Sequence, residues 1–233
     1  MINIETLEII VTDKLPRCFS ASYNYKNNTI YINKNYIDDD NLEEYIFHEL
    51  FHVLGRKEQK DMYYSGLHDE FMGTGINEGY VHHLVLKYFY KPFYKDIYEL
   101  EQEIANIIEI IIGEEKLEKI YSKVEFWVFL EELSEYCKDS YRFISEMDNV
   151  HNSKNNRDSD NLNLALTNAI RMLLEIFFKK QQIELVSNHD IERFFSSIQN
   201  SITLSKVRFK LSITLGNIQN YKVEFYNLQK LKI

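Results

Sequence analysis

The sequence predicts an α+β fold in which a small N-terminal sheet precedes a mainly helical C-terminal region. Two stretches near the start, "LEIIVTD" and "FSASYNYKNNTIYINK", have the apolar or alternating character that is typical of strands. Later stretches such as "LNLALTNAIRMLLEIFFKK" carry apolar residues at helical spacing. With 233 residues, 45% of them hydrophobic and 27% charged, the chain has the composition of a globular protein and the length to bury a sizeable core.

The N-terminal part is expected to contain a hairpin, a helix and a loop. The second of the two stretches reads as two strands joined at residues 26–28, where asparagine tolerates turn geometry. A helix is predicted to begin near Asp40, because Asp40 and Glu43 have the spacing of a capping box. Gly55 stands where a left-handed cap would end this helix. The glycine-containing residues 56–76 are predicted to form a loop.

The remaining chain is predicted to be helical, with one break. A helix is expected over residues 77–90, ended by Pro92, and two long amphipathic helices are expected over residues 94–112 and 114–137. The polar, aperiodic segment "DNVHNSKNNRDSDN" is the best candidate for a linker or loop. The expected divisions are an N-terminal domain with its following helices, this linker, and a helical C-terminal region with a terminal hairpin, over residues 1–147, 148–161 and 162–233.

Composition argues against several classes of protein. The net charge is −9 and no long basic run occurs, which disfavours nucleic acid or an anionic membrane as a partner. Cys18 and Cys137 lie far apart and form no CxxC pair, so a disulfide framework or a thiolate zinc site is not expected. No signal peptide or membrane-spanning stretch is recognisable, which predicts a cytoplasmic protein.

The stretch "IFHELFHVLG" carries the strongest functional signal, because it places His48 and His52 four residues apart with Glu49 between them. On a helix, side chains at this spacing share one face, so both imidazoles can bind one zinc ion. Glu49 lies one residue further round, where it can take a proton from a water that zinc has acidified. The alternative is a helix that is buried elsewhere and carries two histidines on a partly exposed face. Five of the seven histidines lie between residues 48 and 83, which favours the metal site.

A catalytic zinc usually has three protein ligands, and two glutamates are candidates for the third, Glu78 and Glu58. HExxH followed by a downstream helix with "NEG" resembles the gluzincin zinc metallopeptidases, which include the thermolysin and membrane-alanyl aminopeptidase families. The resemblance covers about residues 25–90 and implies a zincin-like fold for the N-terminal part, with a small sheet, an active-site helix and a ligand helix. It also implies that Glu78 is the third zinc ligand, that His48 and His52 are the other two, and that Glu49 is the general base.

The resemblance is not complete. Glu78 follows His52 by 26 residues, which is longer than in either named family, and His82 stands where thermolysin-like enzymes have an aspartate. By the same resemblance, the strand at residues 28–33 is expected to line the substrate cleft. Glu58 fits a different pattern, "HELFHVLGRKE", which is similar to the metzincin frame except that glutamate replaces the usual last ligand. Glu78 is favoured.

A zinc peptidase also needs a hydrogen-bond donor for the oxyanion. His82 is the favoured catalytic candidate, because it shares the helix face of Glu78. Five other residues lie within range by sequence, each more typical of packing or surface positions: Tyr63, Tyr64, His68, Tyr80 and His83. 

The function expected from these observations is zinc-dependent hydrolysis of peptide bonds, with a peptide or protein as substrate. One version is an intracellular protease with a single protein partner that docks on the C-terminal helices. The alternative is a zincin-fold binding or interaction protein without catalysis, although the intact Glu49 argues against it. The substrate, the choice between internal and terminal cleavage, and the oligomeric state are not determined by the sequence.

Overall fold

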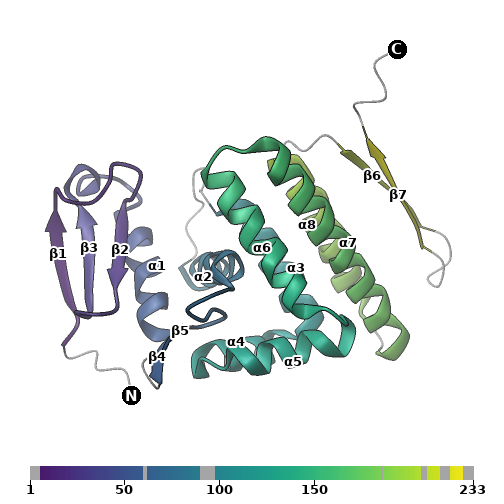
Figure 1. Cartoon of the computed structure of the whole chain (residues 1–233), viewed down its shortest axis with the longest axis horizontal. Helices are drawn as coiled ribbons and strands as arrows, with labels where there is room; N and C mark the ends of the chain where they lie inside the picture. The colour runs from purple at the N-terminus through teal and green to yellow at the C-terminus, as the bar shows by residue number, and fades with distance from the viewer. Residues whose placement is uncertain are drawn as a thin grey trace, which may run out of the picture.

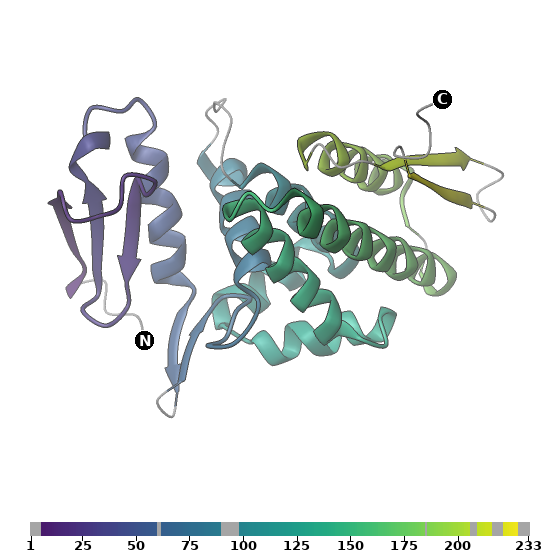
Figure 2. The same ribbon diagram turned by 45° about the horizontal axis from the view of Figure 1, so that its top comes forward.

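The computed structural model describes residues 6–59, 62–89, 98–184, 186–205, 209–215 and 221–227. The fold is mixed α+β, as predicted, with a small sheet at one end and a body of helices (Figure 1). The two parts meet at a pair of helices, α1 (Leu42–Leu54) on the sheet and α2 (Thr74–Phe89) in the helical body. Figure 2 shows the same arrangement, with the sheet and α1 set to one side of the helices that follow.

Within the described residues, the N-terminal sheet has three strands in the order β1-β3-β2, formed by Glu8–Thr12, Thr29–Asn33 and Ala21–Asn24. β1 runs parallel to β3, and β2 and β3 form the predicted antiparallel hairpin. Asn28 in its turn has a φ of 53°, a conformation that asparagine tolerates better than most residues. The expectation that residues 28–33 line the cleft is wrong, because β3 is the central strand and none of these residues lines the two pockets beside α1. The edge strand β2 takes that position.

Helix α1 covers one face of this sheet. Ile30 and Ile32 of β3 and Val53 of α1 are fully or almost fully buried together. The helix begins at Leu42, two residues later than predicted, and its N-cap Asn41 makes no side-chain capping bond. The expected capping box is therefore absent from α1, and Asp39 instead accepts a hydrogen bond from the Asn41 amide.

The predicted loop after α1 begins with a hairpin, β4 (Arg56–Gln59) and β5 (Met62–Ser65). Gly55 does end α1, but its φ of −83° is not left-handed, so the reason given for glycine there was wrong. The actual reason is space. A Cβ at Gly55 would lie 2.8 Å from the hydroxyl oxygen of Tyr121, which donates a hydrogen bond to the Phe51 carbonyl.

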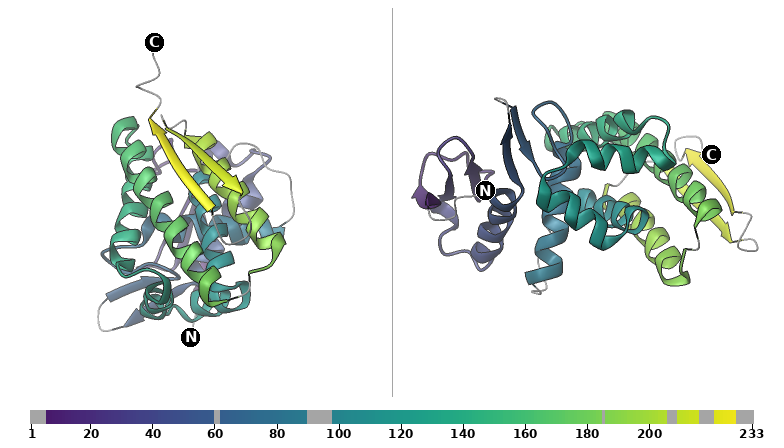
Figure 3. Two further views of the ribbon diagram at one scale, coloured as in Figure 1. Left: turned by 90° about the vertical axis from the view of Figure 1, so that its right-hand side faces the viewer. Right: turned by 90° about the horizontal axis from the view of Figure 1, so that it is seen from below.

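Among the described residues, the helical body contains α2, already given, and six further helices, whose side chains form one buried apolar core. Figures 1 and 3 show how these helices are arranged. The helix expected over residues 114–137 is divided in two by Val124, which has a left-handed φ of 56°. The bounds of the six helices are α3 Glu99–Ile112, α4 Glu114–Lys123, α5 Phe126–Tyr136, α6 Ser140–Asn155, α7 Ser159–Ile183 and α8 Asn188–Ser205.

Residues 148–161, expected to be a linker or loop, are helical except at the turn over residues 156–158. The turn has the hydrogen bonds of a Schellman motif: the Asp158 amide donates to the Ser153 carbonyl and the Arg157 amide donates to the Lys154 carbonyl. Arg157 supplies the left-handed residue, with a φ of 58°. The turn therefore connects two packed helices, α6 and α7.

The predicted terminal hairpin is confirmed as an antiparallel pair, β6 (Phe209–Leu215) and β7 (Tyr221–Asn227). Cys18 and Cys137 are free thiols. Within the described ranges, none of the helices has both the length and the apolar character that crossing a bilayer requires.

Candidate metal centre and cleft

His48, His52 and Glu78 converge where α1 packs on α2. The Nε2 atom of His48 lies 3.2 Å from Nε2 of His52 and 3.1 Å from one oxygen of Glu78. The other oxygen of Glu78 lies 3.4 Å from Nε2 of His52. Donor atoms of a tetrahedral zinc site with bonds of about 2.0–2.2 Å are separated by about 3.3–3.6 Å. The three side chains thus present two nitrogens and a carboxylate at nearly the spacing that zinc requires.

Local structure explains this convergence. His48 and His52 share one face of α1 by their i, i+4 spacing, as predicted. Glu78 lies in the second turn of α2. The next residue, Gly79, allows α2 and α3 to cross at a short distance. A Cβ at Gly79 would lie 2.3 Å from the main-chain oxygen of Glu101 in α3. The glycine of the "NEG" sequence is therefore required by packing, and it fixes the depth at which Glu78 enters the cluster.

The cluster is nearly enclosed, since the exposed fractions of the side chains are 12% for each histidine and 18% for Glu78. Burial by itself would lower the pKa of His52, but the charge of Glu78 raises it to about 9. Burial would raise the pKa of Glu78, yet the charge of His52 and the hydrogen bonds from both histidines hold it well below its usual range. The site therefore binds positive charge strongly, either a proton on His52 or a metal cation in its place.

Asn77 links this cluster to the loop before α2. Its Oδ1 atom accepts a hydrogen bond of 3.0 Å from the Leu67 amide, which fixes the orientation of the side-chain amide. Its Nδ2 atom then lies 3.4 Å from Nδ1 of His52. Asn77 is 3% exposed, so it lies against the ring of His52 on the side of the protein interior. Sequence reasoning did not identify this residue.

Glu49 lies beside the cluster but is not one of its three converging side chains. One of its oxygens accepts a hydrogen bond of 2.7 Å from the main-chain N–H of Tyr23 in β2. In an antiparallel pair, main-chain groups alternate between facing the partner strand and facing outward. The Asn33 N–H donates to the Ser20 carbonyl, so the main-chain groups of Ser20 face β3. The main-chain N–H groups of Ala21 and Tyr23, at alternate positions, therefore face away from β3, toward α1. β2 thus anchors Glu49 at the edge of the sheet.

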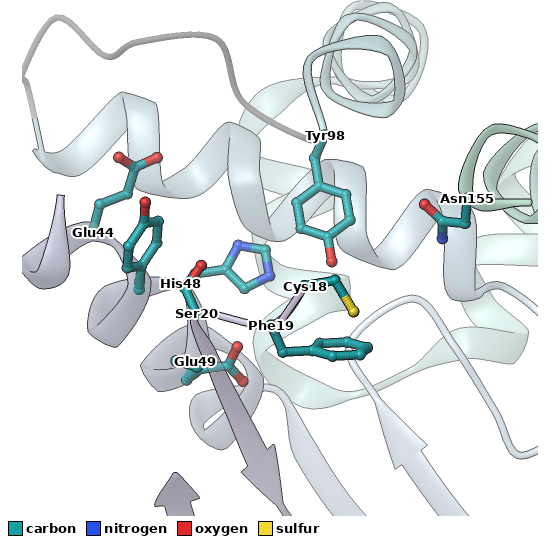
Figure 4. A pocket seen from close by; sticks show the side chains of 10 residues that line it. Cys18, Phe19, Ser20, Glu44, His48, Glu49, Tyr98 and Asn155 are labelled. Atoms are coloured by element: carbon teal, nitrogen blue, oxygen red, sulfur yellow. The ribbon is translucent and has the colours of Figure 1, made fainter. Parts of the chain in front are cut away.

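Two pockets of about 310 and 230 Å3 open beside the cluster, and they share Phe19, Ala21, Glu49 and Tyr98 in their walls. The larger one also contacts His48, and Figure 4 shows Tyr98 pointing its hydroxyl into it from the start of α3. The smaller one contacts His52 and Glu78. The candidate ligands therefore form the floor of a cleft between β2 and the helical body.

Tyr98 is a cleft residue that sequence reasoning missed. Its ring stacks on that of His48, with centroids 5.2 Å apart and an angle of 11°. Burial, followed by the charges of Glu78 and Glu49, raises the pKa of Tyr98 well above its usual range, so its hydroxyl stays protonated. No spacing rule could have identified it, because it follows Glu78 by 20 residues and only the crossing of α3 over α2 brings it to the cleft.

The other sequence candidates are distributed differently. His82 is 2% exposed and is not part of either pocket wall; its ring centroid lies 6.5 Å from that of His48. Tyr63 and His68 do line the smaller pocket, and burial lowers the pKa of His68. The remaining three belong to the interior: Tyr64 and Tyr80 are core residues, and His83 lies 3.0 Å from Glu109.

Glu58, the alternative third ligand, lies in β4, where its main chain pairs with Tyr63. Its side chain lies outside the described part of the structure. The structure does bring Glu78, the favoured candidate, together with both histidines. No family model, curated protein or solved structure matches this chain.

Proposed function

We propose that this protein is a zinc-dependent metallopeptidase of the gluzincin type that hydrolyses peptide bonds. The observation that supports this proposal most strongly is the convergence of Nε2 of His48, Nε2 of His52 and the Glu78 carboxylate within 3.1–3.4 Å of one another. Two imidazoles and one carboxylate are the ligand set of catalytic zinc in enzymes that leave a coordination position open.

The three residues would hold the zinc ion, and the other residues of the cleft would act on the substrate. When bound, zinc supplies a Lewis acid that polarises a carbonyl group and lowers the pKa of water to about 7. Because the Glu78 charge already stabilises a cation at this position, the donor set suits a divalent ion.

Glu49 is the proposed general base. It lies next to His48 in α1 and lines both pockets, so its carboxylate reaches the space where water and peptide meet. The hydrogen bond from the Tyr23 amide holds one carboxylate oxygen and leaves the other to accept a proton from the attacking water. The same carboxylate then donates that proton to the leaving amine, which completes the hydrolysis.

Tyr98 is the proposed donor to the oxyanion. A phenol that stays protonated can donate its hydrogen to a developing negative charge in a site with little water. The ring stack with His48 fixes its direction. This proposal assigns to Tyr98 the catalytic role that the sequence had suggested for His82, whose ring is buried outside both pocket walls.

The cleft wall is suited to an extended peptide. Ala21 lines both pockets, and its main-chain N–H and C=O face outward from the edge strand β2. A peptide can pair with the edge of a strand through such groups, which gives affinity without demanding a particular sequence. The substrate class proposed is accordingly a peptide or an unfolded segment of a protein.

The test compares zinc content and cleavage in three proteins. Wild type, Glu49→Gln and the matched control Glu43→Gln, which makes the same change on the exposed face of α1, are loaded with zinc. Each is incubated with a proteome-derived peptide library, and products are identified by mass spectrometry. All three should hold one zinc per chain, and cleavage by Glu49→Gln should be at least about 10²-fold slower than by the other two.

Three results would count against the proposal. Cleavage by Glu49→Gln at the wild-type rate would exclude the mechanism. Zinc binding that survives Glu78→Ala, measured by metal analysis, would exclude the ligand set. One zinc per chain with no cleavage by any of the proteins, of the library or of folded proteins in a cell extract, would favour the non-catalytic binding protein.

A further inference from the structure

The C-terminal end of α6 contributes one residue, Asn155, to the larger pocket of the cleft. Figure 4 shows its side chain directed toward the same space as the Tyr98 hydroxyl and the Cys18 thiol. An amide side chain can present either an acceptor oxygen or a donor NH2 group to a pocket. Which of the two faces the pocket decides what the pocket binds, and the residues behind Asn155 determine the answer.

Behind Asn155 lies a buried charge pair. Glu101 of α3 is 0% exposed and forms an ion pair with Lys154, and its other oxygen lies 3.1 Å from Nδ1 of His151. Because Lys154 already neutralises Glu101, a cationic His151 would leave an uncompensated charge at a position that is only 8% exposed. The contacts of this cluster therefore favour a ring that carries a single proton. Since a carboxylate only accepts hydrogen bonds, the single ring proton of His151 sits on Nδ1 and points at Glu101.

This tautomer fixes the amide of Asn155. With its proton on Nδ1, His151 has an acceptor at Nε2, which lies 2.9 Å from Nδ2 of Asn155. The NH2 group of Asn155 must donate to that nitrogen, because the amide oxygen cannot. The Oδ1 atom of Asn155 is then left for the pocket. The ring of His151 is also held in place, stacked on Tyr98 with centroids 6.1 Å apart.

We propose that Asn155 Oδ1 forms a binding subsite that accepts a hydrogen bond from an N–H donor on the ligand. The charge of the pocket supports a donor, because Glu44 and Glu49 also line it and its described wall contains no lysine or arginine. The donor is either a main-chain amide or an N-terminal ammonium, which share this chemistry. That the ligand is a peptide rests on the proposed peptidase function; the polarity of the subsite does not.

The first arm of the test measures the polarity directly, by long-range ¹⁵N–¹H correlation spectra of the wild-type histidine rings. His151 should show a neutral ring with its proton on Nδ1, and the signal is assigned by its loss in His151→Phe. A proton on Nε2, or on both nitrogens, near neutral pH would overturn the proposal. In Glu101→Gln the new side-chain amide can donate to Nδ1 of His151. The ring proton of His151 should then move to Nε2, and the side-chain amide of Asn155 should rotate by about 180° so that its oxygen accepts that proton.

The second arm measures binding with two small probes, methylammonium chloride and N-methylacetamide, by following the Asn155 side-chain amide and the Tyr98 signals. Binding of methylammonium indicates a terminal ammonium as the ligand group, and binding of N-methylacetamide indicates a main-chain amide. Asn155→Leu should weaken either by about two- to tenfold or more, as loss of one hydrogen bond predicts. Binding of neither probe, or equal binding by Asn155→Leu, would overturn the subsite. Neither measurement depends on hydrolysis, so failure of the peptidase proposal is distinguished from failure of this one.

Discussion

The carboxylate of Asp148 in α6 accepts a hydrogen bond of 2.8 Å from the main-chain N–H of Gly75 in the first turn of α2. Its other oxygen accepts one of 2.9 Å from the Gly73 amide. Asp148 thus caps α2, although it lies 73 positions from Gly75 in the sequence. Glu78 follows Gly75 by three residues in the same helix. The cap satisfies two free N–H groups and places negative charge at the positive end of the helix dipole.

The first prediction is that Asp148→Ala lowers both stability and zinc affinity. Loss of the cap should cost about 1–2 kcal/mol of unfolding free energy. Because the capped turn positions Glu78, zinc affinity should fall as well. Denaturant unfolding of the metal-free protein gives the first quantity, and titration with zinc gives the second.

Asp158→Ala is the matched control for that prediction, since Asp158 caps α7 by accepting a hydrogen bond from the Asn161 amide. It should lower stability without weakening zinc binding. If both variants weaken zinc binding equally, the effect comes from general destabilisation, and the positioning role of Asp148 is wrong.

The second prediction is that Asn77→Asp tightens zinc binding. A histidine that binds zinc through Nε2 carries its proton on Nδ1, where it needs a hydrogen-bond acceptor. In wild type the group that faces Nδ1 of His52 is Nδ2 of Asn77, which is a donor. Aspartate keeps an acceptor for the Leu67 amide and adds a second acceptor for His52. Such supporting contacts typically change metal affinity about 10- to 100-fold, so a gain of about tenfold is expected in a competitive zinc titration.

Charge alone is tested by Asn152→Asp, which adds the same charge on the exposed face of α6. Its zinc affinity should match that of wild type. A gain equal to that of Asn77→Asp would show that net charge, rather than contact with His52, is responsible. Weaker zinc binding by Asn77→Asp would refute the tautomer argument.

The third prediction concerns Tyr98→Phe. The variant keeps the ring stack with His48, so zinc content should be unchanged, but it removes the hydroxyl that we assign to the oxyanion. Loss of one oxyanion donor typically lowers kcat by about 10²–10³-fold. The measurement is kcat and KM for a peptide from the library that wild type cleaves, with KM expected to change less than kcat.

Tyr88→Phe serves as the control, because it removes a tyrosine hydroxyl that donates to Glu118, and Tyr88 belongs to neither pocket wall. It should leave kcat unchanged. Wild-type kcat in Tyr98→Phe would return the oxyanion role to another residue, and His68 of the smaller pocket would be the next to test.

The fourth prediction is that Arg157→Gly stabilises the turn between α6 and α7. Arg157 has a φ of 58°, which glycine adopts without the steric cost that a Cβ imposes. The gain should be about 0.5–1 kcal/mol in unfolding free energy. Asn156→Gly, at a φ of −83°, should give no gain. Loss of stability in Arg157→Gly would mean that the arginine side chain contributes more than its backbone strain costs.

The sequence alone determined the elements whose signal is local. The i, i+4 spacing of His48 and His52 requires only that α1 be helical, and its apolar residues ensure that. The alternation in β2, β3, β6 and β7 and the asparagines of the first turn likewise specified both hairpins. The "NEG" stretch identified Glu78 by resemblance.

Local signals were misleading where long-range contacts replace them. The polar residues 148–161 have the composition of a linker, but Asp148 caps α2, His151 binds Glu101, and Asp158 caps α7. The sequence does not distinguish an aspartate that caps a distant helix from an aspartate in a solvated loop. The packing of α6 against α2 is what makes Asp148 a cap.

Tertiary structure also decided which residues surround the candidate metal site. Tyr98 and Asn155 reach the cleft from α3 and α6, and the Tyr23 amide reaches Glu49 because β2 is the edge strand. These contacts depend on helix crossings and strand order, which are set by the burial of apolar surface over the whole chain rather than by any short motif. The sequence therefore determined the candidate ligands that share a motif, and the fold determined which residues lie beside them.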